Sequence, residues 1–141
     1  MIRKYEDNDL GELLDAWFSA SKVAHPFLGE EFFERERKNI SSLYLPKAET
    51  WVYEREGVVV GFIALIGNYV GGLFVKTGYQ RKGIGRELMD HARSIRAVLE
   101  LDVFKDNNIG REFYKKQGFT DMHEHTHEDT GFTQLRLKLI C

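Results

Sequence analysis

The stretch Tyr79-Gln80-Arg81-Lys82-Gly83-Ile84-Gly85 is the most informative part of this 141-residue chain. It joins an apolar run, Val70 to Val75, to a helical pattern that begins near Gly85. The first turn of a helix has unpartnered backbone N–H groups and the positive end of the helix dipole, so it attracts anions. Gly83 and Gly85 lack the Cβ atoms that would hold phosphate oxygens away. The neighbouring cations are Arg81, Lys82 and Arg86. The stretch suits a pyrophosphate, although an ordinary turn with solvated cations would also contain glycine and lysine.

Two better-known phosphate loops do not fit this stretch. A Walker loop requires Gly-x-x-x-x-Gly-Lys-Ser/Thr, and no window of the chain supplies it. The dinucleotide fingerprint Gly-x-Gly-x-x-Gly fails because Leu88 stands where the third glycine should be. These two motifs therefore do not support a nucleotide-binding protein, an interpretation that would predict binding of ATP.

The pattern Gln80-x-x-Gly83-x-Gly85 resembles the Gln/Arg-x-x-Gly-x-Gly/Ala signature of the GCN5-related N-acetyltransferase (GNAT) family, whose loop holds the pyrophosphate of acetyl-coenzyme A. Thr77 departs from the pattern, because many relatives have proline there. The resemblance extends over nearly the whole chain, through His25-Pro26-Phe27-Leu28, Trp51-Val52, Gly57, Val60-Gly61-Phe62, Leu101-Asp102-Val103, Asn107, Phe113-Tyr114 and Gly118-Phe119.

The resemblance implies a single GNAT domain over residues 1–141. Its fold is α/β, with a central mixed, mostly antiparallel sheet and helices on both faces. It implies an acetyl-coenzyme A-dependent N-acetyltransferase in which a primary amine attacks the thioester directly in a ternary complex. The amine could belong to a small molecule, a peptide or a protein lysine. A non-catalytic acyl-coenzyme A sensor or scaffold is the alternative, because a fold does not fix a function.

Hydrophobic periodicity and turn residues predict where the elements lie. Four helices are expected. The first begins at Asp7 as its N-cap, and the other three span 30–44, 85–95 and 107–117. Strands are expected over 2–5, 51–55, 58–66, 69–75, 98–104, 119–127 and 132–140. Aromatic residues of the first two helices are expected in the core, with some lining the acceptor cleft.

The composition of the chain limits the classes of partner that it is expected to bind. The net charge is −2, so nonspecific attraction to nucleic acid or to an anionic membrane is not expected. The one cysteine, Cys141, has no partner for a disulfide, and no apolar run approaches the ~20 residues of a membrane span. We expect a cytoplasmic protein, monomeric or homodimeric.

The resemblance also implies the cofactor site. Main-chain amides around Leu73, Phe74 and Val75 would bind the pantetheine arm and polarise the thioester carbonyl. The pyrophosphate and the rest of the cofactor would contact Gln80, Arg81, Lys82, Gly83, Ile84, Gly85, Arg86 and Asn107. Asn107 could equally be an ordinary helix cap.

Tyr114 is the candidate general acid. A phenol with a pKa of ~10 stays protonated at neutral pH and can donate to a thiolate whose conjugate acid has a pKa of ~8.5. The alternative is that Tyr114 only packs in the core.

The sequence does not single out one residue as the general base. A lysine-like amine of pKa ~10.4 needs about 4.6 kcal/mol to be held neutral at pH 7, whereas an N-terminal amine of pKa ~7.7 needs about 1 kcal/mol. Glu100 and Asp102 on one strand face and His25 in a loop are the base candidates.

His123, His125 and His127 alternate along a predicted strand and would point to one face. Same-face positions lie roughly 6.6 Å apart, which is too far for all three to reach one zinc ion. We therefore expect no metal site and an exposed sheet edge.

Overall fold

The computed structural model describes all residues, 1–141, and shows a seven-stranded sheet in the order β1-β2-β3-β4-β5-β7-β6. All neighbouring strands are antiparallel except β4 and β5, which are parallel. This confirms the predicted mixed, mostly antiparallel sheet. The strands are β1 (Ile2–Lys4), β2 (Glu49–Arg55), β3 (Val58–Ile66), β4 (Tyr69–Val75), β5 (Val98–Phe104), β6 (Thr120–Thr126) and β7 (Thr133–Ile140).

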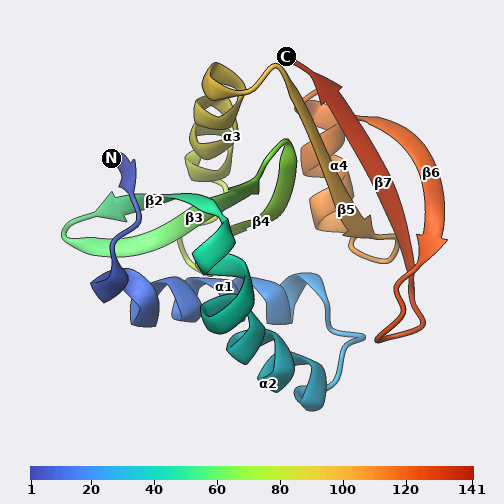
Figure 1. Ribbon diagram of the computed structural model, residues 1–141, viewed down its shortest axis with the longest axis horizontal. Helices are drawn as coiled ribbons and strands as arrows, with labels where there is room; N and C mark the ends of the chain where they lie inside the picture. The colour runs from blue at the N-terminus through green and yellow to red at the C-terminus, as the bar shows by residue number, and fades with distance from the viewer.

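The sheet divides where β4 meets β5. These two strands pair only at their beginnings, where Tyr69 lies opposite Glu100 and the Glu100 N–H donates to Asn68 O at 2.9 Å. Beyond that point they diverge, so the half formed by β1 to β4 and the half formed by β5, β7 and β6 open away from each other (Figure 1). The divergence leaves backbone groups of β4 without a neighbouring strand.

Four helices cover the two faces, as predicted (Figure 1). One layer contains α1 (Leu10–Ala24) and α2 (Glu30–Asn39), and the other contains α3 (Ile84–Ile95) and α4 (Asn108–Lys116). Alternate residues of β3 serve the two layers, because Phe62 packs with α1 and α2 while Ile63 packs with α3. None of the helices combines the length and the apolar character needed to cross a bilayer.

The segment predicted to be helical over 30–44 is helical in the structure, but it is not α-helical throughout. After α2 ends at Asn39 the chain continues through a π-helical turn, Ile40–Tyr44, and a 3-10 turn, Leu45–Lys47. The following strand begins at Glu49, two residues before the predicted start. Pro46, which cannot continue a helix, accounts for the change of direction.

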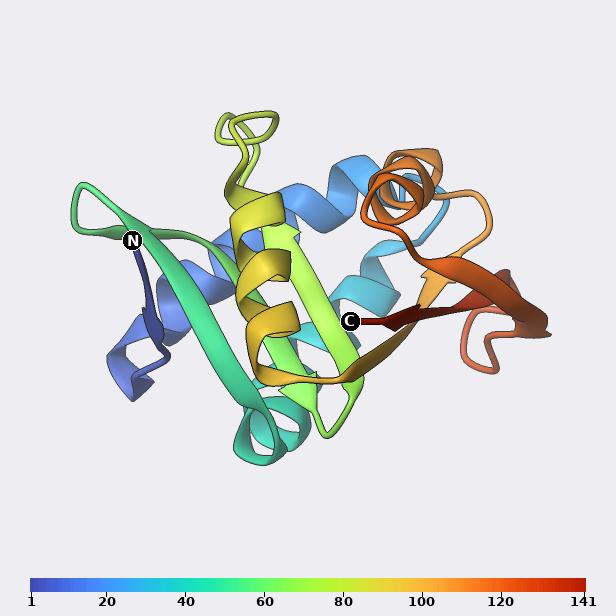
Figure 2. The same cartoon turned by 90° about the horizontal axis from the view of Figure 1, so that it is seen from above.

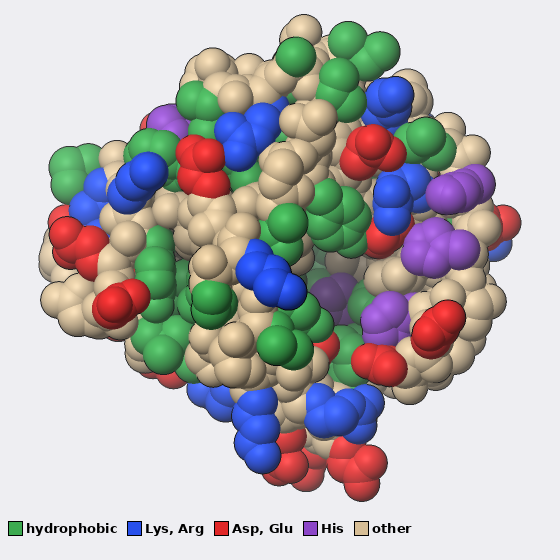
Figure 3. Space-filling view, in the orientation of Figure 1, with side chains coloured by type: hydrophobic (Ala, Val, Ile, Leu, Met, Phe, Trp, Pro, Cys, Tyr) green, Lys and Arg blue, Asp and Glu red, His purple; other side chains and the backbone are tan.

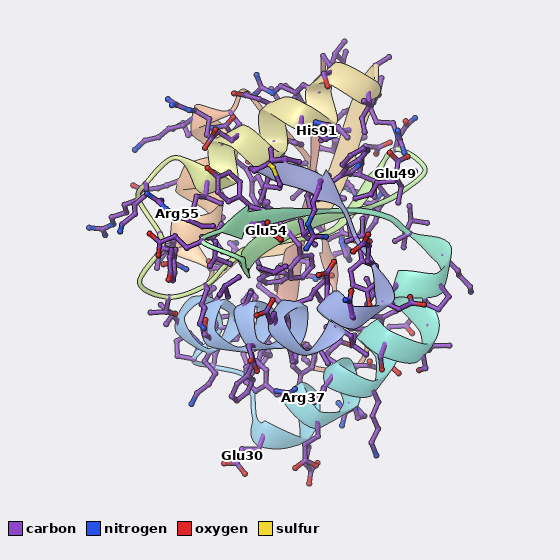
Figure 4. The ribbon with its side chains drawn as sticks, turned by 90° about the vertical axis from the view of Figure 1, so that its left-hand side faces the viewer. Glu30, Arg37, Glu49, Glu54, Arg55 and His91 are labelled. Carbon is purple, nitrogen blue, oxygen red and sulfur yellow. The ribbon has the colours of Figure 1, made fainter.

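The prediction that Asp7 caps the first helix is wrong. The chain enters α1 through a 3-10 turn, Asp7–Asp9, in which the Asp9 carboxylate accepts the Glu6 N–H at 2.8 Å. Asp9 is buried and also accepts two hydrogen bonds from the Arg3 guanidinium, at 2.8 and 2.9 Å. Arg3 reaches on to Glu54 at 3.0 Å, and Figure 4 shows Glu54 on this flank of the sheet. Asp9 thus ties β1, β2 and the start of α1 together.

We expect Asp9→Asn to lower the free energy of unfolding by about 2 kcal/mol at pH 7, because it breaks a buried charge-assisted pair. The hydrogen bonds from Arg3 hold the pKa of the Asp9 carboxyl below its usual 3.8. A lowered pKa means that the stabilisation is complete above about pH 4 and is lost as the pH falls through the native pKa. Urea unfolding at pH 7 and at lower pH measures this difference. Asp7→Asn, at an exposed neighbour, is the control, and an equal loss in both variants would contradict the assignment.

Candidate active site

A cavity of about 720 Å³ lies where β4 and β5 diverge. Figure 3 shows a hollow on this side of the molecule, with histidine side chains within it and beside it. The lining residues come from β4, the loop before α3, the end of β5, α4, α1 and α2. With one exception, Glu100, the structure brings every predicted site residue to this cavity.

The predicted pyrophosphate loop forms one end of the cavity. Gly83 is the N-cap of α3 with φ +83°, and no side chain caps the helix. The first hydrogen bond within α3 is from the Glu87 N–H to Gly83 O, so the amides of Ile84, Gly85 and Arg86 have no partner in the helix. None of the nearby cations Arg81, Lys82 and Arg86 forms an ion pair. The loop offers both free donors and uncompensated positive charge to an anion.

Two contacts fix the path of this loop, which stands out from the sheet between β4 and α3 (Figure 2). At its entrance the Thr77 N–H donates to Ser19 Oγ at 3.0 Å, and the Thr77 hydroxyl donates to Ser19 O at 3.1 Å. A proline at position 77 could not make the first of these bonds. Within the loop, Gln80 Nε2 donates to Val75 O at 3.0 Å. Thr77 therefore fastens the loop to α1, and Gln80 fastens it to the end of β4.

The open edge of β4 supplies a second set of donors. Phe74 lies opposite Phe62 of β3, and the Lys76 N–H donates to Val60 O at 2.7 Å. Hydrogen bonding alternates along an antiparallel pair, so the amides of Leu73 and Val75 point away from β3 and into the gap before β5. Phe74 instead belongs to the ladder with β3. Of the three predicted amides, Leu73 and Val75 are the two that face the cavity.

Tyr114 lines the cavity from α4, opposite these amides. Its ring is half-buried between Phe113 and Phe119, with centroid separations of 5.3 and 5.5 Å. Its hydroxyl makes no hydrogen bond to the protein. Burial raises the pKa of the Tyr114 phenol, so the group is protonated at neutral pH. The structure therefore presents a free O–H donor at the cavity wall.

Asn107 and His25 connect α4 to the end of α1. Asn107 Oδ1 caps α4 by accepting the Gly110 N–H at 2.9 Å, and its Nδ2 lies 3.3 Å from His25 Nε2. An amide nitrogen can only donate, so His25 Nε2 accepts, and His25 Nδ1–H donates to Ser21 Oγ at 2.9 Å. Burial lowers the pKa of His25 to about 4. The imidazole is thus neutral at pH 7, with its lone pair occupied by Asn107.

The two acidic base candidates are held by Arg136. Asp102 accepts hydrogen bonds from Arg136 at 2.7 and 2.9 Å and from Tyr69 at 2.8 Å, and it lies 2.8 Å from His125 Nε2. Burial alone would raise the pKa of Asp102, but these hydrogen bonds lower it below its ordinary value. Glu100 lies 3.7 Å from Arg136 and outside the cavity. Asp102 therefore has its oxygens occupied by Arg136, Tyr69 and His125, and Glu100 does not reach the cavity.

The three alternating histidines have separate partners. The rings of His123 and His125 lie 5.8 Å apart, His125 contacts Asp102, and His127 contacts Thr130 in the turn after β6. No group of three or more histidine, cysteine, aspartate or glutamate side chains is arranged to hold a metal ion.

Comparison with known proteins assigns the chain to a family. Residues 46–121, more than half of the chain, match the family described as "Acetyltransferase (GNAT) domain". The chain belongs to the GNAT family. It is an acetyl-coenzyme A-dependent N-acetyltransferase with an amine acceptor, and its free amides and unpaired cations fit the diphosphate of that cosubstrate.

Two curated relatives of this GNAT enzyme come from Escherichia coli (strain K12). The peptidyl-lysine N-acetyltransferase YiaC is 30% identical over 84% of this chain and 82% of its own. The peptidyl-lysine N-acetyltransferase YjaB is 33% identical over 84% of this chain and 80% of its own. The solution structure of apo YjaB from Escherichia coli superposes with a TM-score of 0.87, covering 98% of this chain and 95% of that one at 29% identity.

A more distant structure shows the same fold. The paiA N-acetyltransferase of Thermoplasma acidophilum, solved in complex with coenzyme A, superposes with a TM-score of 0.77 at 22% identity and covers 96% of both chains.

The opposite end of the GNAT cavity contains one residue that the sequence did not single out, Glu36. Glu36 of α2 and His127 after β6 both line it, together with Phe32 of α2. Burial raises the pKa of the Glu36 carboxyl, and its hydrogen bonds and the charge of His127 act in the opposite direction. The sequence does contain one signal, because Phe32 and Glu36 are spaced i, i+4 and share one face of α2. Phe33 of α2 and Ile40 directly after it instead pack in the core.

Proposed function

We propose that this GNAT enzyme acetylates the side-chain amine of lysine in a peptide or protein. The observation that carries the proposal is its similarity to two enzymes named peptidyl-lysine N-acetyltransferases, at 30% and 33% identity over 84% of the chain. The acceptor end of the cavity supports it, because an aromatic wall with a carboxylate suits an apolar stem that ends in an ammonium group. The cytoplasmic location and the oligomeric state stay predictions.

In this proposal the two ends of the cavity have separate tasks. The loop amides and the cations around Gly83 hold the diphosphate of acetyl-coenzyme A, and the Leu73 and Val75 amides hydrogen-bond to its arm and to the thioester carbonyl. Tyr114 donates its proton to the departing thiolate. The lysine enters between α2 and the turn after β6, so that its amine reaches the thioester directly.

The test is release of coenzyme A thiol from acetyl-coenzyme A with three peptides. One has a lysine and an acetylated N-terminus, one has the lysine replaced by arginine, and one has a free N-terminus without lysine. We expect release, and a mass increase of one acetyl group, with the first peptide. Release only with the free N-terminus would contradict the lysine assignment. Binding of acetyl-coenzyme A without release with any amine would indicate the sensor alternative.

A further inference from the structure

His127 is held rigidly at the acceptor end of the cavity. It follows β6 directly, and a compact turn closes behind it, because its N–H donates to Phe132 O at 2.8 Å and its carbonyl accepts the Gly131 N–H at 2.7 Å. Its Nδ1 lies 2.9 Å from Thr130 Oγ1, which also accepts the Phe132 N–H at 3.3 Å. The turn thus determines both the position and the orientation of the ring.

The other ring nitrogen of His127 is free. Nε2 makes no hydrogen bond to the protein and is not among its buried unpartnered atoms, although the side chain as a whole is half-buried. Two aromatic rings stand against the imidazole edge to face, Phe104 at 5.2 Å and Phe32 at 6.2 Å between centroids. Since Thr130 occupies Nδ1 on the side of the turn, Nε2 is the nitrogen available to a ligand.

The charged groups around His127 favour an approaching cation. Glu36 faces it from α2, and Asp129 and Glu128 belong to its own turn. Lys105, which follows β5, is paired with Glu124 at 2.7 Å. An ammonium group entering here meets the Glu36 carboxylate in the cavity wall, and no lysine or arginine of α2 lines the cavity.

Other titratable groups along the cavity are already engaged. His25 Nε2 accepts from Asn107, and Asp102 accepts from Arg136 and Tyr69. Glu36 accepts a long hydrogen bond from the Tyr44 hydroxyl at 3.4 Å, and it supplies negative charge beside the imidazole. His127 is therefore the histidine with an unoccupied nitrogen in the acceptor region.

We propose that His127 is the general base of the acetyl transfer, with Thr130 orienting its ring and Glu36 holding the acceptor ammonium beside it. The proposal rests on the proposed function. In the tautomer that this role requires, His127 Nδ1–H donates to Thr130 Oγ1 and the lone pair is on Nε2.

The step is balanced as follows. Nε2 takes one proton from the ammonium, and the neutral amine forms the C–N bond at the thioester carbonyl carbon. Collapse of the adduct breaks the C–S bond, and the thiolate receives a proton from Tyr114. The acceptor nitrogen then loses its second proton, which passes through water to the Tyr114 phenolate and restores the phenol. His127 releases the proton that it took to solvent. One acetyl group is transferred and one proton is released.

The test is the pH profile of kcat/KM with a lysine peptide. If His127 removes the proton, the rate follows the product of neutral imidazole and protonated amine. It therefore rises with pH while the imidazole loses its proton and then levels off below the lysine pKa of ~10.4. In His127→Gln the rate should be about 10- to 100-fold lower at pH 7. It should also climb tenfold per pH unit toward pH 10 without a plateau, because only free amine reacts.

Matched variants separate this role from folding. His123→Gln, exposed on the same strand and outside the cavity, should keep the wild-type profile. Thr130→Val should lower the plateau while Thr130→Ser keeps it, which tests the orienting bond even if His127→Gln does not fold. A plateau that survives in His127→Gln, or a Thr130→Val enzyme with an unchanged plateau, would overturn the proposal. If no lysine peptide reacts, the proposed function fails, and the same profile is measured with whichever amine accepts acetyl.

Discussion

Tyr114→Phe will lower kcat by about 10- to 1,000-fold and leave the affinity for acetyl-coenzyme A within about twofold. The change removes one oxygen whose hydrogen bonds the protein does not use, so the packing against Phe113 and Phe119 is retained. Loss of the proton donor raises the barrier for expulsion of the thiolate without affecting the diphosphate. Steady-state kinetics and calorimetric binding of acetyl-coenzyme A measure the two effects separately.

Tyr53→Phe is the control for this variant. Tyr53 has a hydrogen-bonded hydroxyl, 3.1 Å from Glu87, and it lies outside the cavity. Its kcat should equal that of the wild type. A Tyr114→Phe enzyme with the wild-type kcat would remove Tyr114 from the mechanism and leave it as a packing residue.

Gly83→Val will weaken coenzyme A binding by about 100-fold. Gly83 has φ +83°, which a β-branched residue adopts only at a cost of about 1–2 kcal/mol, so the loop shifts and the first amides of α3 lose their common direction. Loss of one or two charge-assisted hydrogen bonds to the diphosphate corresponds to about 3 kcal/mol, or roughly 100-fold in Kd. Calorimetric titration with coenzyme A gives this number directly.

Gly57→Val separates backbone strain from the loss of the site. Gly57 has φ +80° in the turn between β2 and β3, and a Cβ there would meet nothing within 4 Å. The two variants therefore have comparable backbone strain, but only one changes the loop. We expect similar losses of thermal stability and a normal affinity for coenzyme A in Gly57→Val. Equal weakening of binding in both would show that general destabilisation is responsible.

Local patterns in the sequence predicted most of the fold. The apolar runs of 58–66 and 69–75 and the alternation of 98–104 place three strands with the bounds that the structure has. Short-range rules apply to these segments because their side chains alternate between two buried layers. The rules miss the 3-10 turn at Leu45–Lys47, and they fail at Asp7, where the buried pair of Arg3 and Asp9 determines the helix start.

The candidate site was predictable only on its cofactor side. The glycines and cations of 80–86 lie within one loop, so their spacing alone indicates an anion site. The acceptor end is different, because Glu36, His127 and Phe104 meet only after the sheet has formed. The hydrogen bond between His25 and Asn107 likewise joins residues 82 positions apart. No local sequence pattern predicts such contacts. The same holds for the two hydrogen bonds that Arg136 donates to Asp102.

We infer that the loop before α3 binds the diphosphate of acetyl-coenzyme A within the cavity. The most direct measurement is calorimetric titration of the purified protein with coenzyme A and with pantetheine, which lacks the diphosphate. We expect one site per chain for coenzyme A and at least about 100-fold weaker binding for pantetheine. The reason is that most of the binding free energy of coenzyme A comes from the contacts of its diphosphate with the loop. No heat with coenzyme A, or equal affinities for the two compounds, would contradict it.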